Sequence, residues 1–301
     1  MTPETPVTAE RWVQIAIDAT RNTADELADA LLRAGALSVT FEDAADNPII
    51  EPAPGETPLW DHTVVVALCD AGTDPQPVLE RAQRMLGWPH ALRARVSELH
   101  QCDWERAWRE HFQPMQFGER LWVCPSDQRV ENSEAAVVTL DPGLGFGTGT
   151  HPTTALCLQW LADHLAAGER VIDFGCGSGI LAIAAAKLGA AHVWAVDIDP
   201  QARRAAADNA SLNKVAHIVS VMPPDELPAI TVDCVVANIL ARPLIALMPI
   251  FASRLRRGGR LVVSGLLADQ ESALLAALAA EFALTGVEER EGWLRLEAAR
   301  R

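Results

Sequence analysis

At 301 residues the chain is long enough for two domains, and 49% hydrophobic with 22% charged residues is typical of a soluble globular protein. The 25 basic and 40 acidic residues give a net charge of −15, which disfavours direct nucleic-acid binding because a polyanion requires a basic surface. The sequence also lacks a membrane-length apolar run, a signal peptide and the cysteine or histidine spacing of a metal site, so we expect a cytoplasmic protein with reduced thiols and no metal.

The first hundred residues alternate strand-like and helix-like patterns. Strands are predicted at residues 11–18, 36–43, 62–70 and 91–99, and helices at residues 24–35 and 74–86. The order βαββαβ is that of a ferredoxin-like sandwich. We therefore expect a small N-terminal ferredoxin-like α/β domain over residues 1–100, with a proline-rich loop at residues 48–58.

A short amphipathic segment separates this part from the rest of the chain. Residues 102–112 have helical spacing, and we expect a linker helix within residues 101–118. Strand patterns at residues 120–125 and 135–141 then lead into a segment with alternating glycines, Gly143 to Gly149. Such glycines let a backbone approach something closely.

From residue 152 onward, strands and helices alternate regularly. Strands are predicted at residues 170–175, 192–199, 217–222, 233–239, 259–265, 282–290 and 292–298, and helices at residues 152–165, 179–189, 200–213, 243–255 and 269–280. This alternation predicts a doubly wound, Rossmann-like α/β domain over residues 119–301. Such sheets bind ligands beyond the carboxyl ends of their strands, so those ends should carry the functional residues.

The first of these strands ends in the strongest motif of the chain. Asp173 is followed by Gly175, Gly177 and Gly179, and then by an apolar helix. A dinucleotide fingerprint would need glycine where Ile180 stands, and a phosphate loop would need a lysine that is missing. An acid just before the turn instead suits a ligand with a cationic ammonium group.

The second strand ends with two acids, either of which could reach the ribose of a nucleoside. Asp197 lies 22 residues beyond Gly175, which is the separation expected for a ribose-binding acid. Asp199 precedes Pro200 and resembles a helix cap, so the pattern favours Asp197. A ribose and a cationic amino-acid tail together favour S-adenosylmethionine over a nicotinamide dinucleotide.

These segments, with residues 141–154 and the Val-Val-Ala-Asn-Ile-Leu run at 235–240, resemble the bacterial ribosomal protein L11 methyltransferase family. The resemblance implies a seven-stranded class I methyltransferase domain behind a small substrate-recognition domain. It implies methylation of lysine ε-amino groups and the N-terminal α-amino group of ribosomal protein L11. By the family pattern Thr154, Gly175, Asp197 and Asn238 contact the cofactor, S-adenosylmethionine.

Methyl transfer to an amine requires a neutral nucleophile, whereas a free lysine is almost entirely protonated at pH 7. The side-chain oxygen of Asn238 can accept an amine hydrogen without a charge that would keep the amine protonated, so we expect a catalytic role for it. His151 could act as a general base, but it also precedes Pro152 in a typical helix start, and we favour the latter role. Asp173 and Gly177 are expected to bind the cofactor with the residues above.

The glycine segment is expected to be a flexible flap over the cofactor, with Phe146 as an apolar contact. The acidic surface would attract a basic protein partner, and we expect a monomer. Other interpretations stay open: a related methyltransferase for another protein lysine or a small amine, a nicotinamide-dependent dehydrogenase, or a non-catalytic ribosome-assembly module.

Overall fold

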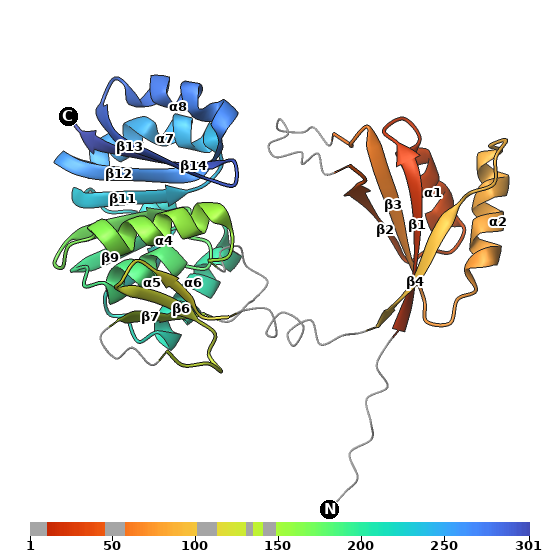
Figure 1. Cartoon of the computed structure of the whole chain (residues 1–301), viewed down its shortest axis with the longest axis horizontal. Helices are drawn as coiled ribbons and strands as arrows, with labels where there is room; N and C mark the ends of the chain where they lie inside the picture. The colour runs from red at the N-terminus through yellow and green to blue at the C-terminus, as the bar shows by residue number, and fades with distance from the viewer. Residues whose placement is uncertain (1–10, 46–57, 101–112, 131–134, 141–148) are drawn as a thin grey trace, which may run out of the picture. The chain divides into compact units, whose positions relative to one another are not determined.

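The computed structural model describes residues 11–45, 58–100, 113–130, 135–140 and 149–301. These residues fall into two compact units, one within residues 1–107 and one within residues 108–301 (Figure 1). Within the described residues no helix has both the length and the apolarity to cross a bilayer. The cysteines among them are buried free thiols, as predicted, and Cys102 lies outside the described residues.

The N-terminal unit is a four-stranded antiparallel sheet with two helices. Its elements are β1 (Arg11–Thr20), α1 (Ala24–Arg33), β2 (Ser38–Asp43), β3 (His62–Cys69), α2 (Pro75–Leu86) and β4 (Ala94–His100). The strand order is β2-β3-β1-β4, and both helices share one apolar core with alternate residues of β1 and β3. The helices therefore cover one face of the sheet. The strand order and the position of the helices are those of the ferredoxin-like sandwich predicted from the sequence.

The C-terminal unit is built on a seven-stranded sheet. The strands β8 (Arg170–Phe174), β9 (His192–Val196), β10 (Val219–Met222), β11 (Val232–Asn238), β12 (Leu255–Leu267) and β13 (Phe282–Arg290) run in one direction. β14 (Trp293–Arg300) lies between β12 and β13 and pairs antiparallel with both. The order is β10-β9-β8-β11-β12-β14-β13. All seven strands predicted from residue 170 on are present. The chain moves outward from β8 through β9 to β10 and then returns to β11, so strand order reverses between β8 and β11.

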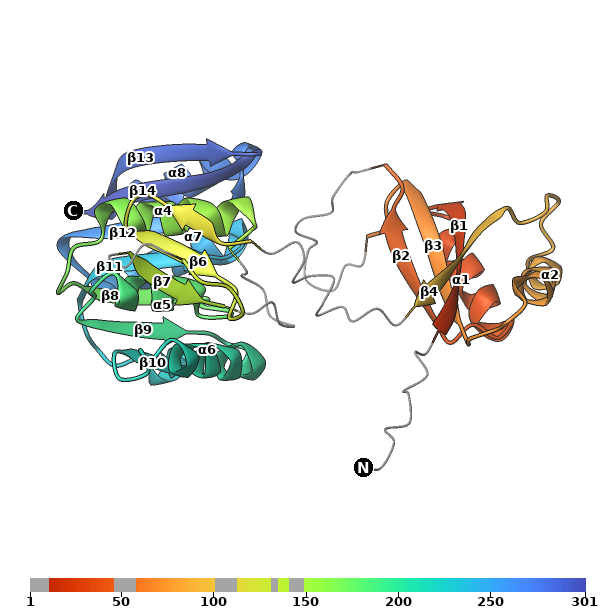
Figure 2. The ribbon, with the colours of Figure 1, turned by 60° about the horizontal axis from the view of Figure 1, so that its bottom comes forward.

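Helices cover both faces of this sheet (Figures 1 and 2). The helices are α4 (Pro152–His164), α5 (Ile180–Lys187), α6 (Pro200–Leu212), α7 (Ala241–Arg254) and α8 (Glu271–Leu278), with short 3₁₀ turns at Pro224–Glu226 and Ala268–Gln270. One core joins α4, α5 and α6 to one face, and a second joins α7 and α8 to the other. Neighbouring residues of β8 divide accordingly: Val171 belongs to the first core and Ile172 to the second. This is the doubly wound α/β fold.

A small sheet packs outside α5. It consists of β5 (Met115–Phe117), β6 (Leu121–Cys124) and β7 (Ala136–Thr139), and its apolar residues join the first core. Every residue from Ile180 to Ala186 is buried, because α5 lies between the two sheets. Four alanines in this helix allow both sheets to approach closely. The sequence pattern predicts a linker over residues 101–118, but residues 115–117 pair with β6 and belong to the small sheet.

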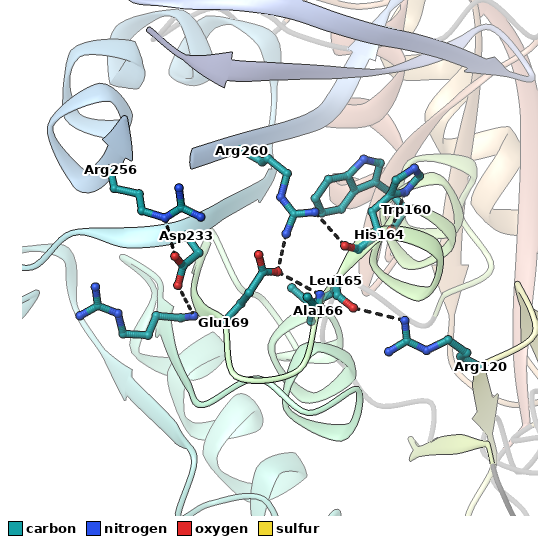
Figure 3. Close-up of polar contacts among 10 residues, drawn as sticks. Arg120, Trp160, His164, Leu165, Ala166, Glu169, Asp233, Arg256 and Arg260 are labelled. Atoms are coloured by element: carbon teal, nitrogen blue, oxygen red, sulfur yellow. Dashed lines mark hydrogen bonds and ion pairs between the residues drawn. The ribbon is translucent and has the colours of Figure 1, made fainter. Parts of the chain in front are cut away.

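A polar network ties the amino-terminal ends of the strands together (Figure 3). Glu169, just before β8, pairs with Arg260 of β12 and accepts a hydrogen bond from the Ala166 amide at 3.0 Å. Arg260 also donates to the His164 carbonyl at 2.7 Å and stands 4.9 Å from the centre of the Trp160 ring. Since both charged side chains are largely buried, each neutralises the charge of the other.

A second carboxylate fixes the neighbouring strand at the same end. Asp233 of β11 accepts hydrogen bonds from the Arg170 amide at 2.8 Å and from Arg256 Nε at 2.6 Å (Figure 3). These bonds and the Arg256 charge hold the pKa of Asp233 below its ordinary value, against the opposing effect of burial. The network thus links β8, β11 and β12 near their amino-terminal ends. Ligands are expected at the opposite, carboxyl ends of these strands.

We predict that Glu169→Gln lowers the melting temperature of the C-terminal unit by about 5–10 °C. The substitution leaves Arg260 without its anion in a largely buried place, at a cost of about 2–3 kcal/mol. Calorimetry measures this, with Glu291→Gln as the control because the Arg290–Glu291 pair is exposed and 3.7 Å long. Equal melting temperatures for Glu169→Gln and wild type would show that the network does not stabilise the fold.

Candidate cofactor and methyl-transfer site

The candidate site lies where β8, β9 and β11 end. Parallel strands present their carboxyl ends at one edge of the sheet, and strand order reverses between β8 and β11. Ligands of doubly wound sheets bind at such a reversal. Asp173 lies near the end of β8, Asp197 follows β9, and Asn238 ends β11. Gly175 directly follows β8.

The turn after β8 is shaped by three glycines. Gly175, Gly177 and Gly179 have φ angles of +78°, +52° and +79°, in the left-handed region that disfavours other residues. The amides of Gly175 and Cys176 both donate to the carbonyl of Val196, at 2.7 and 3.0 Å. The turn is therefore anchored to the end of the neighbouring strand, and α5 begins directly after it.

Asp173 is completely buried beneath this turn. Its Oδ2 accepts a hydrogen bond from the amide of Ala182 at 2.9 Å, whereas its Oδ1 is buried and has no hydrogen-bond partner among the residues that the structure describes. Burial raises the pKa of Asp173 to about 7, opposed by the Ala182 bond and aided by the charge of Asp197. A buried carboxylate oxygen without a partner is costly, and a cationic ligand group would relieve that cost.

Asp197 and Asp199 have different contacts, and Asp199 takes the helix-cap position that the sequence pattern predicts. Asp197 is partly exposed, and its two oxygens accept from the amides of Gly177 and Asp199, each at 2.9 Å. Asp199 caps α6 by accepting from the amide of Gln201 at 2.8 Å, with Pro200 at the first helical position. Asp197 thus holds the glycine turn and still offers lone pairs to a ligand.

Asn238 meets Thr154 at the end of β11. Its Nδ2 donates to Thr154 Oγ1 at 3.1 Å, although the two residues are 84 positions apart. Thr154 is 3% exposed in the first turn of α4. This bond leaves the carbonyl oxygen of Asn238 available as an acceptor for an amine hydrogen.

His151 occupies the helix start that the sequence favoured for it. Its Nδ1 lies 3.3 Å from the amide of Thr153 and 2.7 Å from its Oγ1, so the ring caps α4. The ring also meets Trp293 edge-on, with centroids 4.9 Å apart. Burial lowers the pKa of His151, partly offset by the charge of Glu291. Nδ1 is committed to the cap, which leaves less of the ring for proton transfer.

Sequence reasoning missed one residue of this edge, Ile239. Its side chain fills the space where a side chain on Gly175 would lie, and its main chain packs against Gly265 of β12. The sequence signal was the Asn-Ile-Leu run itself, but only the fold shows what the isoleucine touches. Phe146 and most of the glycine segment, residues 141–148, lie outside the described residues, so the flap stays a prediction.

The site residues fit S-adenosylmethionine. Asp173 Oδ1, which has no partner within the described part of the chain, can accept a hydrogen bond from an ammonium group. Asp197 is a partly exposed carboxylate directly after the second strand. The glycine turn presents backbone rather than side chains between them. Asn238 and Thr154 add uncharged polar groups at the third strand end.

The chain is similar to known ribosomal protein L11 methyltransferases over almost its whole length. A family model described as ribosomal protein L11 methyltransferase (PrmA) matches residues 11–301. The ribosomal protein L11 methyltransferase of Edwardsiella ictaluri is 50% identical over 291 residues, 96% of this chain and 99% of the relative. That of Aeromonas hydrophila is 51% identical over 286 residues, 95% of this chain and 97% of the relative.

Among solved structures, the crystal structure of ribosomal protein L11 methylase from Lactobacillus delbrueckii subsp. bulgaricus is similar. It is 32% identical in sequence with a TM-score of 0.59, and the match covers 63% of this chain and 100% of that chain.

Proposed function

Because this chain belongs to the ribosomal protein L11 methyltransferase family, we propose that it methylates ribosomal protein L11, on lysine ε-amino groups and the N-terminal α-amino group. The observation that carries the proposal is the gathering of Asp173, the glycine turn, Asp197 and the Asn238–Thr154 pair at one sheet edge. S-adenosylmethionine, when bound there, supplies a methyl group on a sulfonium whose departure needs no acid.

The chain's own residues would then bind and orient. Asp173 would hold the ammonium group of the cofactor, and Asp197 the ribose hydroxyls. The carbonyl oxygen of Asn238 would accept a hydrogen from the neutral amine and aim its lone pair at the methyl carbon. Asn238 carries no charge, so it does not favour the protonated amine. If the amine loses its proton to water before the site closes over it, no general base is needed.

The net charge of −15 supports a basic protein as substrate and disfavours direct contact with nucleic acid. We propose a monomeric, cytoplasmic enzyme whose encounter with the substrate is steered by charge. Raising the ionic strength should then slow association.

Mass spectrometry of unmethylated ribosomal protein L11, incubated with the purified chain and S-adenosylmethionine, tests the function. We expect methyl additions on lysines and on the N-terminal amine, and none when the cofactor is omitted. Binding of ribosomal protein L11 without methyl addition would support an assembly module instead. Addition only to other proteins or small amines would support a related methyltransferase.

The two acids after β9 allow a matched prediction. Asp197→Ala should weaken binding of S-adenosylhomocysteine at least 30-fold, because it removes the ribose acceptor and the bond to the Gly177 amide. Asp199→Ala removes only the cap of α6, at a cost of about 1 kcal/mol in stability, and should leave that affinity within threefold. Isothermal titration calorimetry measures both. Equal losses in the two variants would contradict the assignment of the ribose to Asp197.

A further inference from the structure

Ile239 lies between two glycines, Gly175 in the turn after β8 and Gly265 in β12. A methyl group on Gly175 would overlap the Cγ2 atom of Ile239. On the other side, a Cβ on Gly265 would lie 2.7 Å from the carbonyl carbon and 3.0 Å from the amide nitrogen of Ile239. Both glycines have positive φ angles, +78° and +95°. The side chain of Ile239 is thus packed against the glycine turn, and its main chain is packed against β12.

The contact with β12 is fixed by a β-bulge. Ser264 pairs with Arg295 and Leu266 with Leu294, so Gly265 is the extra residue of β12. The bulge brings β12 against the chain that leaves β11, and the amide of Ile239 donates to the carbonyl of Ser264 at 3.1 Å. The main chain of Ile239 therefore has a defined place relative to the sheet.

The glycine turn and Asn238 are each held by bonds that do not involve Ile239. Gly175 and Cys176 are bonded to Val196, and Gly177 to Asp197. Asn238 is bonded to Thr154. Removing the Ile239 side chain would leave both groups these hydrogen bonds and would remove the packing contact between Ile239 and Gly175.

We propose that Ile239 is a positioning residue for methyl transfer. Its Cγ2 methyl sets the gap between the turn that binds the cofactor and the strand end that carries Asn238, and so sets the distance between methyl donor and amine. This inference rests on the proposed function. Because a displacement of about 1 Å at a reacting centre can cost up to about 100-fold in rate, a single methyl contact is enough to matter.

Two conservative substitutions separate this role from simple packing. Ile239→Val keeps the Cγ2 methyl and loses only the terminal methyl, whereas Ile239→Leu keeps the volume but moves that branch away from Gly175. We expect Ile239→Leu to lower the single-turnover rate of methyl transfer to ribosomal protein L11 about tenfold and Ile239→Val less than twofold. Both should bind S-adenosylhomocysteine within threefold of wild type, because the turn keeps its own bonds.

Ile230 provides the matched control, since it is also partly buried against the same core but precedes β11 rather than following it. Ile230→Leu and Ile230→Val should leave the rate unchanged, with thermal unfolding recorded for all four variants. Equal rates for Ile239→Leu and Ile239→Val would overturn the proposal, as would a parallel loss of S-adenosylhomocysteine affinity in Ile239→Leu. A wild-type chain that transfers no methyl group to ribosomal protein L11 would instead contradict the proposed function itself.

Discussion

Asn238→Ala is expected to slow methyl transfer to ribosomal protein L11 by about 100-fold in single-turnover measurements. The alanine cannot accept a hydrogen from the amine, so the variant loses the contact by which we propose that Asn238 orients the nitrogen lone pair. The variant also leaves Thr154 Oγ1 without its donor, but the bonds of Asp173, Gly177 and Asp197 remain. Affinity for S-adenosylhomocysteine should therefore fall much less than the rate.

Asn238→Asp separates hydrogen bonding from charge. A carboxylate of the same shape still accepts a hydrogen, but its negative charge stabilises the protonated amine and raises the amine's pKa. The rate should fall at pH 7 and recover as the pH rises, with a profile shifted upward by about one pH unit relative to wild type. If Asn238→Asp had the wild-type profile, Asn238 would not contact the amine, and if Asn238→Ala kept the wild-type rate, the residue would have no part in the reaction.

The alternation of strands and helices from residue 152 on was predictable because each element has its own periodicity. Asp197 and Asp199 could also be told apart from the sequence, since a helix cap before proline is a local pattern. Strand β5 was not predictable, because three residues carry no periodicity and its pairing with β6 defines it. The same holds for Arg260, whose partners His164 and Glu169 lie 96 and 91 positions away.

The site shows the same division. Asp173, Gly175 and Gly177 are neighbours in the chain, so their common turn could be inferred from spacing. The Asn238–Thr154 bond joins β11 to α4, and the sequence related these residues only through a family resemblance. The contact of Ile239 with Gly175 and Gly265 depends on three strand ends meeting, which no local pattern encodes. Whatever depends on tertiary contacts had to come from the structure.

Asp173→Asn is expected to stabilise the free protein at pH 8 and to weaken cofactor binding. Burial raises the pKa of Asp173 to about 7, above the value of about 3.9 in an unfolded chain. The folded state therefore holds a proton that the unfolded state releases between about pH 4 and pH 7. Stability from this group is present below pH 4, is lost as the pH rises to about 7, and is lowest where the buried carboxylate is charged.

Asparagine keeps an oxygen for the Ala182 amide and cannot ionise, so it removes the penalty that wild type carries above pH 7. The melting temperature of Asp173→Asn should exceed that of wild type at pH 8, and the difference should shrink toward pH 4. Calorimetry across this range measures it. A variant that is less stable than wild type at pH 8 would show that the carboxylate is not costly in the free protein.

The affinity of wild type for the cofactor should rise with pH, whereas the stability of the free protein should fall. An ammonium group beside Asp173 favours the charged carboxylate, so binding to wild type requires loss of the proton. With a pKa of about 7, affinity should fall about tenfold from pH 8 to pH 6. Asp173→Asn should bind S-adenosylhomocysteine more weakly than wild type at pH 8, and its affinity should not show this dependence on pH. Titration of the ligand itself affects both proteins equally and cancels in the comparison. The same slope in both proteins would place the cationic group of the cofactor away from Asp173. The burial of Asp173 Oδ1, which has no partner among the described residues, would then only destabilise the fold.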